Sequence, residues 1–160
     1  MLDPGMDKLA ASLARFADIL TPAEIRQILT LQKAPLPTGI RINSLKATPD
    51  TAMQALAERY QWEVQPISFC KSAWLIKSAD VAPGGTIEHR LGTYYLQDAA
   101  SMVPVCLLSY NVQGPLILDM AASPGGKTTH LIDRSQDLGF VLANYGSRSR
   151  MPALRSVLAS

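Results

Sequence analysis

The sequence predicts an α/β protein in two parts: a small N-terminal α+β domain, then the first β-α-β-α part of an incomplete Rossmann-like parallel sheet. Apolar segments with strand alternation and segments with helical periodicity follow one another along the chain. Residues 116–130, LILDMAASPGGKTTH, combine a short apolar strand, a glycine turn and a helix start. A second strand and helix are expected over residues 140–158. We place the domains at 1–90 and 91–160.

Composition excludes several classes of protein. The 160 residues are 48% hydrophobic and 18% charged, which is enough to bury a core and unlike a disordered chain. The net charge of +2 is too small to indicate a nucleic-acid partner by itself. No apolar run reaches the ~18–20 residues that cross a bilayer, and the first residues have no signal-peptide pattern. We therefore expect a cytoplasmic protein without membrane contact.

The first 90 residues alternate between helices and short strands. Apolar spacing predicts a helix over 7–20, and Thr21 with Glu24 forms a capping-box pattern that starts another. Residues 38–45 alternate, with Ile40 and Ile42 on one face of a half-buried strand. A helix is expected from residue 48 to 60. Short strands are expected at 62–64 and 74–76.

The remaining residues carry the predicted parallel sheet. We expect an extended segment at 94–96 and a helix that begins at Asp98 or Ser101. The strand at 116–119 leads through the turn at 121–126 into a helix, and a second strand and helix follow. Cys70 and Cys106 match no metal-ligand or disulfide spacing, so we expect two small buried side chains and no metal site.

Three interpretations of the glycine turn compete. The first is a phosphate-binding loop: the order of Ala121, Gly126, Lys127 and Thr128 differs from that motif only in having alanine at its first position. Two features count against it. Pro124 donates no N–H, and the carboxylate of the aspartate that ends the strand would lie near the phosphate. A site for S-adenosylmethionine fits better, because an acid suits its ammonium and helix N–H groups suit its carboxylate. The third interpretation is a turn that only connects a strand to a helix.

The turn closely resembles the first methyltransferase motif of the Nol/Nop/Sun family of RNA 5-methylcytosine methyltransferases. That motif runs Asp-x-Cys/Ala-Ala-Ala/Ser-Pro-Gly-Gly-Lys-Thr, and residues 119–128 here are DMAASPGGKT. Residues 92–102, GTYYLQDAASM, look like the family's segment before the motif. Residues 40–46, IRINSLK, look like a strand of its N-terminal domain.

The resemblance implies an S-adenosylmethionine-bound catalytic domain behind a domain that helps to hold rRNA or tRNA. Gln97, Asp98 and Ser101 would pack close to the cofactor. Arg41 and Asn43 would face the RNA or the catalytic pocket, with Lys46 beside them, although a solvated strand face is an equal alternative for Arg41. One of Tyr94 and Tyr95 is expected in the core, and either could stack on bases. The implied cofactor-binding residues are Asp119, Ala121, Ala122, Ser123, Pro124, Gly125, Gly126 and Lys127, with Tyr145 at the ribose position.

The chain departs from the family at two places. The family's reaction needs a cysteine thiolate in a Pro-Cys or Thr-Cys motif on later strands, and neither cysteine here matches, so we assign no catalytic residue. Where the family has an acid for the ribose hydroxyls, Tyr145 follows Asn144, so we expect weak or absent cofactor binding. We expect the N-terminal portion of an RNA cytosine-C5 methyltransferase, truncated and inactive alone. The alternatives are a non-catalytic RNA-binding or protein-interaction module and, further off, a phosphate-loop nucleotide binder.

A short parallel sheet would leave apolar surface uncovered. We therefore expect self-association, or an exposed patch, that includes Val141, Leu142, Leu154 and Leu158.

Overall fold

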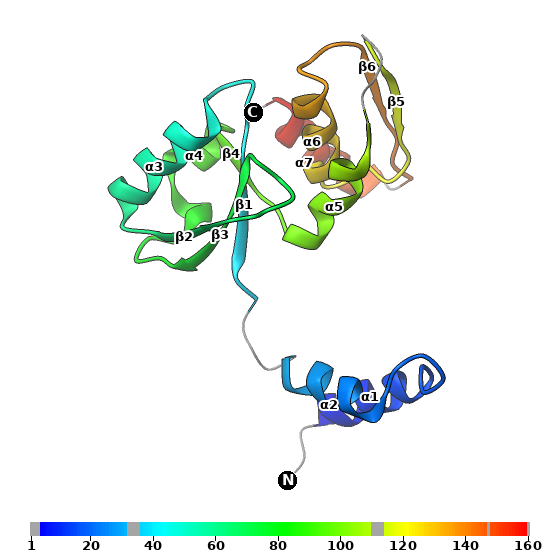
Figure 1. Ribbon diagram of the computed structural model, residues 1–160. Helices are drawn as coiled ribbons and strands as arrows, with labels where there is room; N and C mark the ends of the chain where they lie inside the picture. Colours follow the sequence, from blue (N-terminus) through cyan, green and yellow to red (C-terminus); the bar gives the residue numbers. More distant parts are fainter. Residues whose placement is uncertain (1–3, 32–35, 110–113, 147, 160) are drawn as a thin grey trace. The chain divides into compact units, whose positions relative to one another are not determined.

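The computed structural model describes residues 4–31, 36–109, 114–146 and 148–159 (Figure 1). The chain forms two compact units, residues 1–36 and 37–160. Among the described helices, none has the length and apolar character needed to cross a membrane.

The first unit contains two helices, α1 (Pro4–Ala14) and α2 (Pro22–Leu31). The first helix ends earlier than the apolar spacing predicts, because residues 15–19 continue as turns, with the Ile19 amide bonded to the Phe16 carbonyl at 2.9 Å. The capping box before α2 is confirmed. The Thr21 amide and hydroxyl each donate to the Glu24 carboxylate at 2.7 Å, which satisfies groups that a helix start leaves unpaired.

The second unit begins with a four-stranded antiparallel sheet in the order β2-β3-β1-β4. The strands are β1 (Thr38–Ile42), β2 (Glu63–Pro66), β3 (Ala73–Ser78) and β4 (Tyr94–Leu96). Two short helices, η1 (Pro83–Gly85) and α4 (Ile87–Arg90), lead into β4. A Cβ at Gly39 would lie 2.3 Å from the Gln97 carbonyl oxygen, so only glycine fits at this position of β1. This close approach of the two backbones accompanies the pairing of β4 with β1, which makes β4 part of the same sheet as the first three strands.

Both faces of this sheet are covered. Helix α3 (Pro49–Tyr60) packs Met53 and Leu56 on one face, where Ile40, Ile42 and Tyr94 are fully buried. This confirms the alternation of β1 and the core position of one tyrosine of the pair. On the other face, a smaller apolar cluster brings helix α5 (Ala99–Leu107) against β3. Its buried members are Ile67, Cys70, Ala73 and Met102.

The predicted β-α-β-α segment is also confirmed. Strands β5 (Leu116–Asp119) and β6 (Phe140–Ala143) pair in parallel, and α6 (Gly126–Arg134) connects them. A short turn of helix, η2 (Arg148–Arg150), precedes α7 (Met151–Ala159). Helix α6 contacts α5, β6 and α7, which places it at the centre of this part of the unit.

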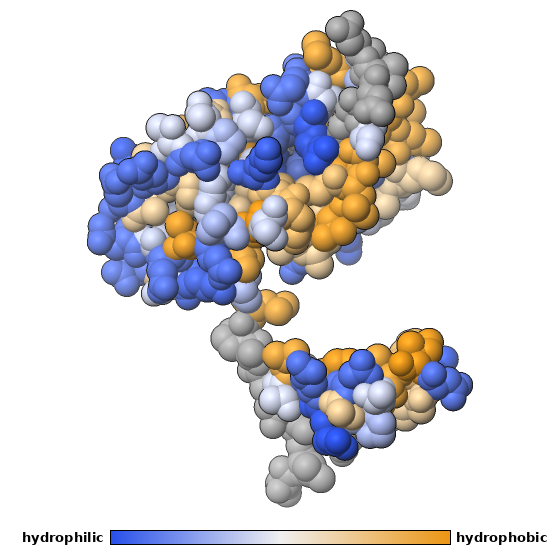
Figure 2. Space-filling model, in the orientation of Figure 1, coloured by the Kyte–Doolittle hydropathy of each residue, from blue (hydrophilic) through white to orange (hydrophobic). Residues whose placement is uncertain are grey.

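One face of the β5–β6 pair is apolar and exposed, as Figure 2 shows where hydrophobic atoms gather over the two strands. The register sets Leu116 beside Phe140 and Leu118 beside Leu142, and each of these side chains is more than half exposed. One part of the prediction is wrong: Leu154 is buried, because its side chain packs toward the glycine turn. Val141 is half-buried and Leu158 exposed. Self-association through this face stays a prediction.

Candidate cofactor site

The turn between β5 and α6 is organised by the Asp119 carboxylate. Its Oδ1 accepts a hydrogen bond from the Ala121 amide at 3.1 Å, and its Oδ2 accepts one from the Thr128 hydroxyl at 2.7 Å. The Asn144 amide donates to the Asp119 carbonyl at 2.8 Å, and the Asn144 carbonyl accepts from the Ala122 amide at 3.1 Å. These bonds fix the turn to the carboxyl ends of both parallel strands, the edge where open α/β sheets bind ligands.

The two glycines of the turn have different reasons for lacking a side chain. Gly125 has a φ of +118°, and a Cβ there would lie 2.9 Å from Val157 Cγ1, so the fold itself requires glycine. At Gly126 a Cβ would meet only the Gln97 side chain, at the ordinary contact distance of 3.8 Å. No described neighbour in the chain demands glycine at position 126. The bare backbone there is instead available for close approach by a ligand.

Two buried polar atoms beside the turn lack a hydrogen-bond partner among the described residues. They are the hydroxyl oxygen of Ser123, within the turn, and Nε2 of Gln97, whose side chain lies next to Gly126 as the resemblance implies. A buried polar atom without a partner costs roughly 1–3 kcal/mol. A polar ligand seated on the turn would supply these partners, so the site fits S-adenosylmethionine, with its amino, carboxylate and hydroxyl groups.

The arrangement disagrees with a phosphate-binding loop. In such a loop the threonine hydroxyl after the lysine binds Mg²⁺. Here Thr128 is 1% exposed and its hydroxyl donates to Asp119 and faces the Ala122 carbonyl at 3.3 Å. The hydroxyl is therefore committed to the turn. Lys127 is exposed at the start of α6.

The structure also positions Tyr145. It follows β6 directly, at the same edge of the sheet as Asp119, and its side chain is half-buried. This is the place where the resemblance implies a ribose-binding acid. The phenol offers one hydroxyl there and no carboxylate.

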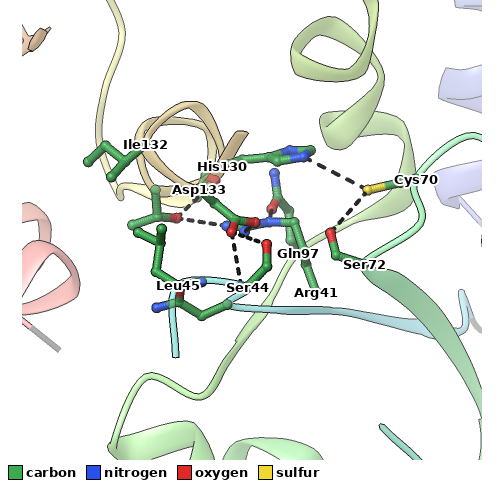
Figure 3. Close-up of polar contacts among 12 residues, drawn as sticks. Arg41, Ser44, Leu45, Cys70, Ser72, Gln97, His130, Ile132 and Asp133 are labelled. Atoms are coloured by element: carbon green, nitrogen blue, oxygen red, sulfur yellow. Dashed lines mark hydrogen bonds and ion pairs between the residues drawn. The ribbon is translucent and has the colours of Figure 1, made fainter. Parts of the chain in front are cut away.

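Arg41 lies inside the unit, so the prediction of a solvated strand face is wrong. Its guanidinium bonds three side chains, each at 2.9 Å: Asp133 Oδ2, Thr129 Oγ1 and Gln97 Oε1 (Figure 3). Burial lowers the pKa of Arg41, and the Asp133 carboxylate opposes this effect. A fully enclosed guanidinium presents no N–H to RNA outside the fold. It instead joins β1 and the residue after β4 to the helix that begins at the cofactor turn.

The other two predicted RNA-binding residues lie near the end of β1. Asn43 is buried, with its Nδ2 donating to the Gly92 carbonyl at 3.1 Å and its Oδ1 accepting from the Leu45 amide at 3.2 Å. Lys46 is exposed, and its Nζ donates to the Leu91 carbonyl at 2.7 Å. Asn43 therefore shapes the loop, whereas Lys46 is at the surface.

A cavity of about 310 Å³ opens beside this loop. Tyr95 lines it, with its ring centroid 5.1 Å from the Arg41 guanidinium carbon. Lys46 lines the same cavity, and Thr129 and Val157 contribute α6 and α7 to its wall. Since Thr129 lies one turn after the glycines, the cavity adjoins the start of α6.

Sequence reasoning missed the partners of Arg41. Thr129 and Asp133 are four residues apart and so share one face of α6. The buried isoleucines on either side of Arg41 point to the opposite face of β1, so they gave no signal that Arg41 is buried or that it needs a buried acid.

Comparisons with known proteins agree with this geometry. Residues 11–99 match a family described as the N-terminal domain of 16S rRNA methyltransferase RsmF, and residues 106–159 match 16S rRNA methyltransferase RsmB/F. Ribosomal RNA small subunit methyltransferase F of Shewanella amazonensis is 39% identical over 126 residues, covering 78% of this chain and 27% of that protein. The protein of the same name from Erwinia tasmaniensis is 38% identical over 140 residues, covering 85% and 29%. The chain thus spans under a third of these relatives' length.

Solved structures show the same fold. A methyltransferase homolog protein from Pyrococcus horikoshii is 26% identical with a TM-score of 0.84, over 99% of this chain and 53% of that chain. The structure of NSun6 from the same organism aligns with a TM-score of 0.77 at 15% identity, over 91% of this chain and 61% of that one, and shows the fold alone. The family match covers more than half of the chain and agrees with the resemblance in its sequence. The chain therefore belongs to the RsmF family of 16S rRNA methyltransferases, within the Nol/Nop/Sun group.

Proposed function

We propose that this chain supplies the cofactor turn and an RNA-holding domain of a ribosomal RNA cytosine-C5 methyltransferase. The family's enzymes depend on S-adenosylmethionine. The observation that carries the proposal is the turn itself: a carboxylate fixed at the strand end, a glycine that no described neighbour requires, and buried polar atoms awaiting partners.

S-Adenosylmethionine, when bound, supplies an activated methyl group. Asp119 keeps lone pairs beyond its two internal hydrogen bonds and accepts from the ammonium. The first amides of α6, at Gly126 and Lys127, face the carboxylate because a helix start leaves its N–H groups without partners in the helix. Ser123 Oγ adds a polar contact. Tyr145 offers one hydrogen bond at the ribose position, so we propose weak binding.

RNA contact is proposed at the cavity beside β1. Lys46 is the exposed cation at its rim and attracts a phosphate, while Tyr95 gives a ring for base stacking. Arg41 acts by position, holding the wall of the cavity from inside. The relatives are named for the small ribosomal subunit, which favours rRNA over tRNA as the substrate. We also propose that the protein is located in the cytoplasm.

We assign no nucleophile to the chain. Cys70 lies in the cluster between β3 and α5, and Cys106 packs against that cluster, with its backbone carbonyl bonded to the Arg134 side chain at 3.3 Å. Neither is among the residues of the turn or of the cavity. We therefore propose that the chain alone binds cofactor and RNA without transferring a methyl group.

Titration with S-adenosylhomocysteine, followed by protein NMR, tests the cofactor site. We expect weak, saturable shifts centred on residues 119–129, and at least a tenfold loss of affinity in Asp119→Asn. Asp80→Asn changes an exposed acid outside the site and is the matched control. Tight Mg²⁺-dependent binding of ATP that Lys127→Ala abolishes would instead establish a phosphate loop.

A non-catalytic RNA-binding module is the second candidate, favoured by the lack of a thiol at the turn among the described residues. Binding to a 16S rRNA fragment is measured across a salt series. Retained RNA binding with no S-adenosylhomocysteine shifts supports this module alone. If Lys46→Ala leaves both the affinity and the salt slope unchanged, the RNA surface lies elsewhere.

A further inference from the structure

Three residues far apart in the sequence come together at α6, the helix that begins at the cofactor turn. Cys70 comes from the loop between β2 and β3, Cys106 from α5 and His130 from α6. Their sulfur and ring nitrogen atoms all lie within 4.8 Å of one another. Figure 3 shows Cys70 and His130 facing each other, with Cys70 Sγ 3.8 Å from His130 Nε2. None of the three belongs to the cofactor or RNA site proposed above.

These distances suit a tetrahedral metal ion. Zinc bonds of about 2.3 Å to sulfur and about 2.0–2.1 Å to nitrogen place two sulfur ligands about 3.8 Å apart and a sulfur and a nitrogen about 3.6 Å apart. The Cys70–His130 separation is already at that spacing. The other two separations, which are at most 4.8 Å, need to shorten by at most about 1.2 Å to reach it.

His130 is a costly residue for an ordinary core. It is 1% exposed, its Nδ1 has no hydrogen-bond partner among the described residues, and its Nε2 faces only the weak acceptor of Cys70. Burial lowers the pKa of this imidazole to about 3, so it is neutral at physiological pH. A neutral buried imidazole is the form that binds a metal ion.

Both thiols must lose a proton to bind a metal ion. Burial and the neighbouring Cys70 raise the pKa of the Cys106 thiol, and the positive charge of Arg134 opposes this shift only in part. Zn²⁺ displaces one proton from each thiol, so two protons leave and the ion with its two thiolates carries no net charge. That neutrality suits a buried position better than an isolated thiolate.

We propose that Cys70, Cys106 and His130 bind one zinc ion. A cavity of about 470 Å³, lined by Cys70, Ser72 and His130, adjoins the cluster and supplies room for water as a fourth ligand. The ion would join the β2–β3 loop to α5 and α6. It would crosslink the antiparallel sheet to α5 and to the helix that begins at the cofactor turn, with one of its four coordination positions held by water.

The test uses the reduced 160-residue chain, stripped with a chelator and titrated with Zn²⁺, and with Co²⁺ as an optical substitute. We expect one ion per chain, thiolate-to-cobalt absorption and a higher melting temperature with Zn²⁺. Cys70→Ser and Cys106→Ser each remove a ligand, so each should weaken Zn²⁺ binding by more than the roughly 10–100-fold that loss of an outer-shell partner costs. His89→Gln, which changes the only other histidine of the chain, should bind normally.

A second measurement needs no variant. Zinc should slow the reaction of both thiols of the unsubstituted protein with an aromatic disulfide reagent. The proposal is overturned if the reduced protein takes up no stoichiometric ion, if the serine variants bind as tightly as the parent, or if zinc leaves thiol reactivity unchanged. If the reduced protein takes up no zinc, and oxidised glutathione converts Cys70 and Cys106 to a disulfide with release of two reduced glutathione molecules, the pair is a redox pair and the zinc site is overturned.

Discussion

Arg41 and Asp133 form an ion pair of 2.9 Å in which the exposed fractions of the two side chains are 0% and 3%. The pair links the interior strand β1 to the helix α6. The same carboxylate accepts hydrogen bonds from the amide and the hydroxyl of Ser44. Burying two charges is expensive, so each depends on the other for its place in the fold.

Removal of one partner should destabilise the protein strongly. We expect Asp133→Ala to lower the free energy of unfolding by about 3–5 kcal/mol, since it leaves a buried guanidinium without its counter-charge. The double variant Arg41→Met/Asp133→Leu should lose less free energy of unfolding than the single variants Arg41→Met and Asp133→Leu lose together. Urea denaturation followed by circular dichroism measures these values. Arg59→Met, at an exposed ion pair with Glu88, is the control and should change little.

The two glycines of the turn should separate stability from binding. Gly125→Ala should cost about 1–3 kcal/mol of unfolding free energy, because its φ is +118° and the new Cβ meets Val157. Gly126→Ala should leave stability unchanged or slightly higher, since its Cβ has only an ordinary contact. It should nevertheless weaken S-adenosylhomocysteine binding. Equal melting temperatures for the two variants would contradict this division of roles.

Tyr94 should make stability depend on alkaline pH. Burial raises the pKa of Tyr94 to about 12, and its hydroxyl donates to the Pro83 carbonyl at 2.7 Å. The folded state holds this proton more tightly than the unfolded state, whose tyrosine pKa is about 10. The resulting stability is complete below pH 10 and is lost as pH rises toward 12, by about 1 kcal/mol at pH 11. Comparison of urea unfolding at pH 8 and pH 11 should show a smaller drop for Tyr94→Phe.

The apolar face of the β5–β6 pair should bind a hydrophobic dye. Leu118 and Leu142 are neighbours across the two strands and both are more than half exposed. Replacing them in Leu118→Lys/Leu142→Glu should reduce dye fluorescence and any self-association measured by light scattering. Unfolding free energy should change little, because neither side chain is in the core. A dye signal of the same strength in the double variant would place the apolar surface elsewhere.

The local elements were largely predictable from sequence. The capping box at Thr21 and Glu24, the alternation of Ile40 and Ile42, and the strand-turn-helix at Asp119 each depend on neighbours within a few residues. Such signals survive in the sequence because short-range geometry produces them. The cofactor turn could therefore be located before its contacts were known.

The long-range features could not be read in this way. Alternation placed Arg41 opposite the isoleucines correctly, but whether that face met water depended on α6, whose residues come about ninety positions later. The burial of Leu154 against the turn, and the meeting of Cys70 with His130, depend on the same packing. Spacing rules for metal ligands address ligands close in sequence, so they do not detect a cluster assembled from a loop and two helices.

The Arg41–Asp133 pair also bears on how the chain folds as it is synthesised. The antiparallel sheet is complete once β4 has been made, yet the guanidinium on its central strand still lacks a carboxylate. That partner emerges only with the last turn of α6. All four strands of the sheet are therefore synthesised before the carboxylate that neutralises Arg41. The sheet reaches its full stability only after the cofactor turn and α6 have also been made.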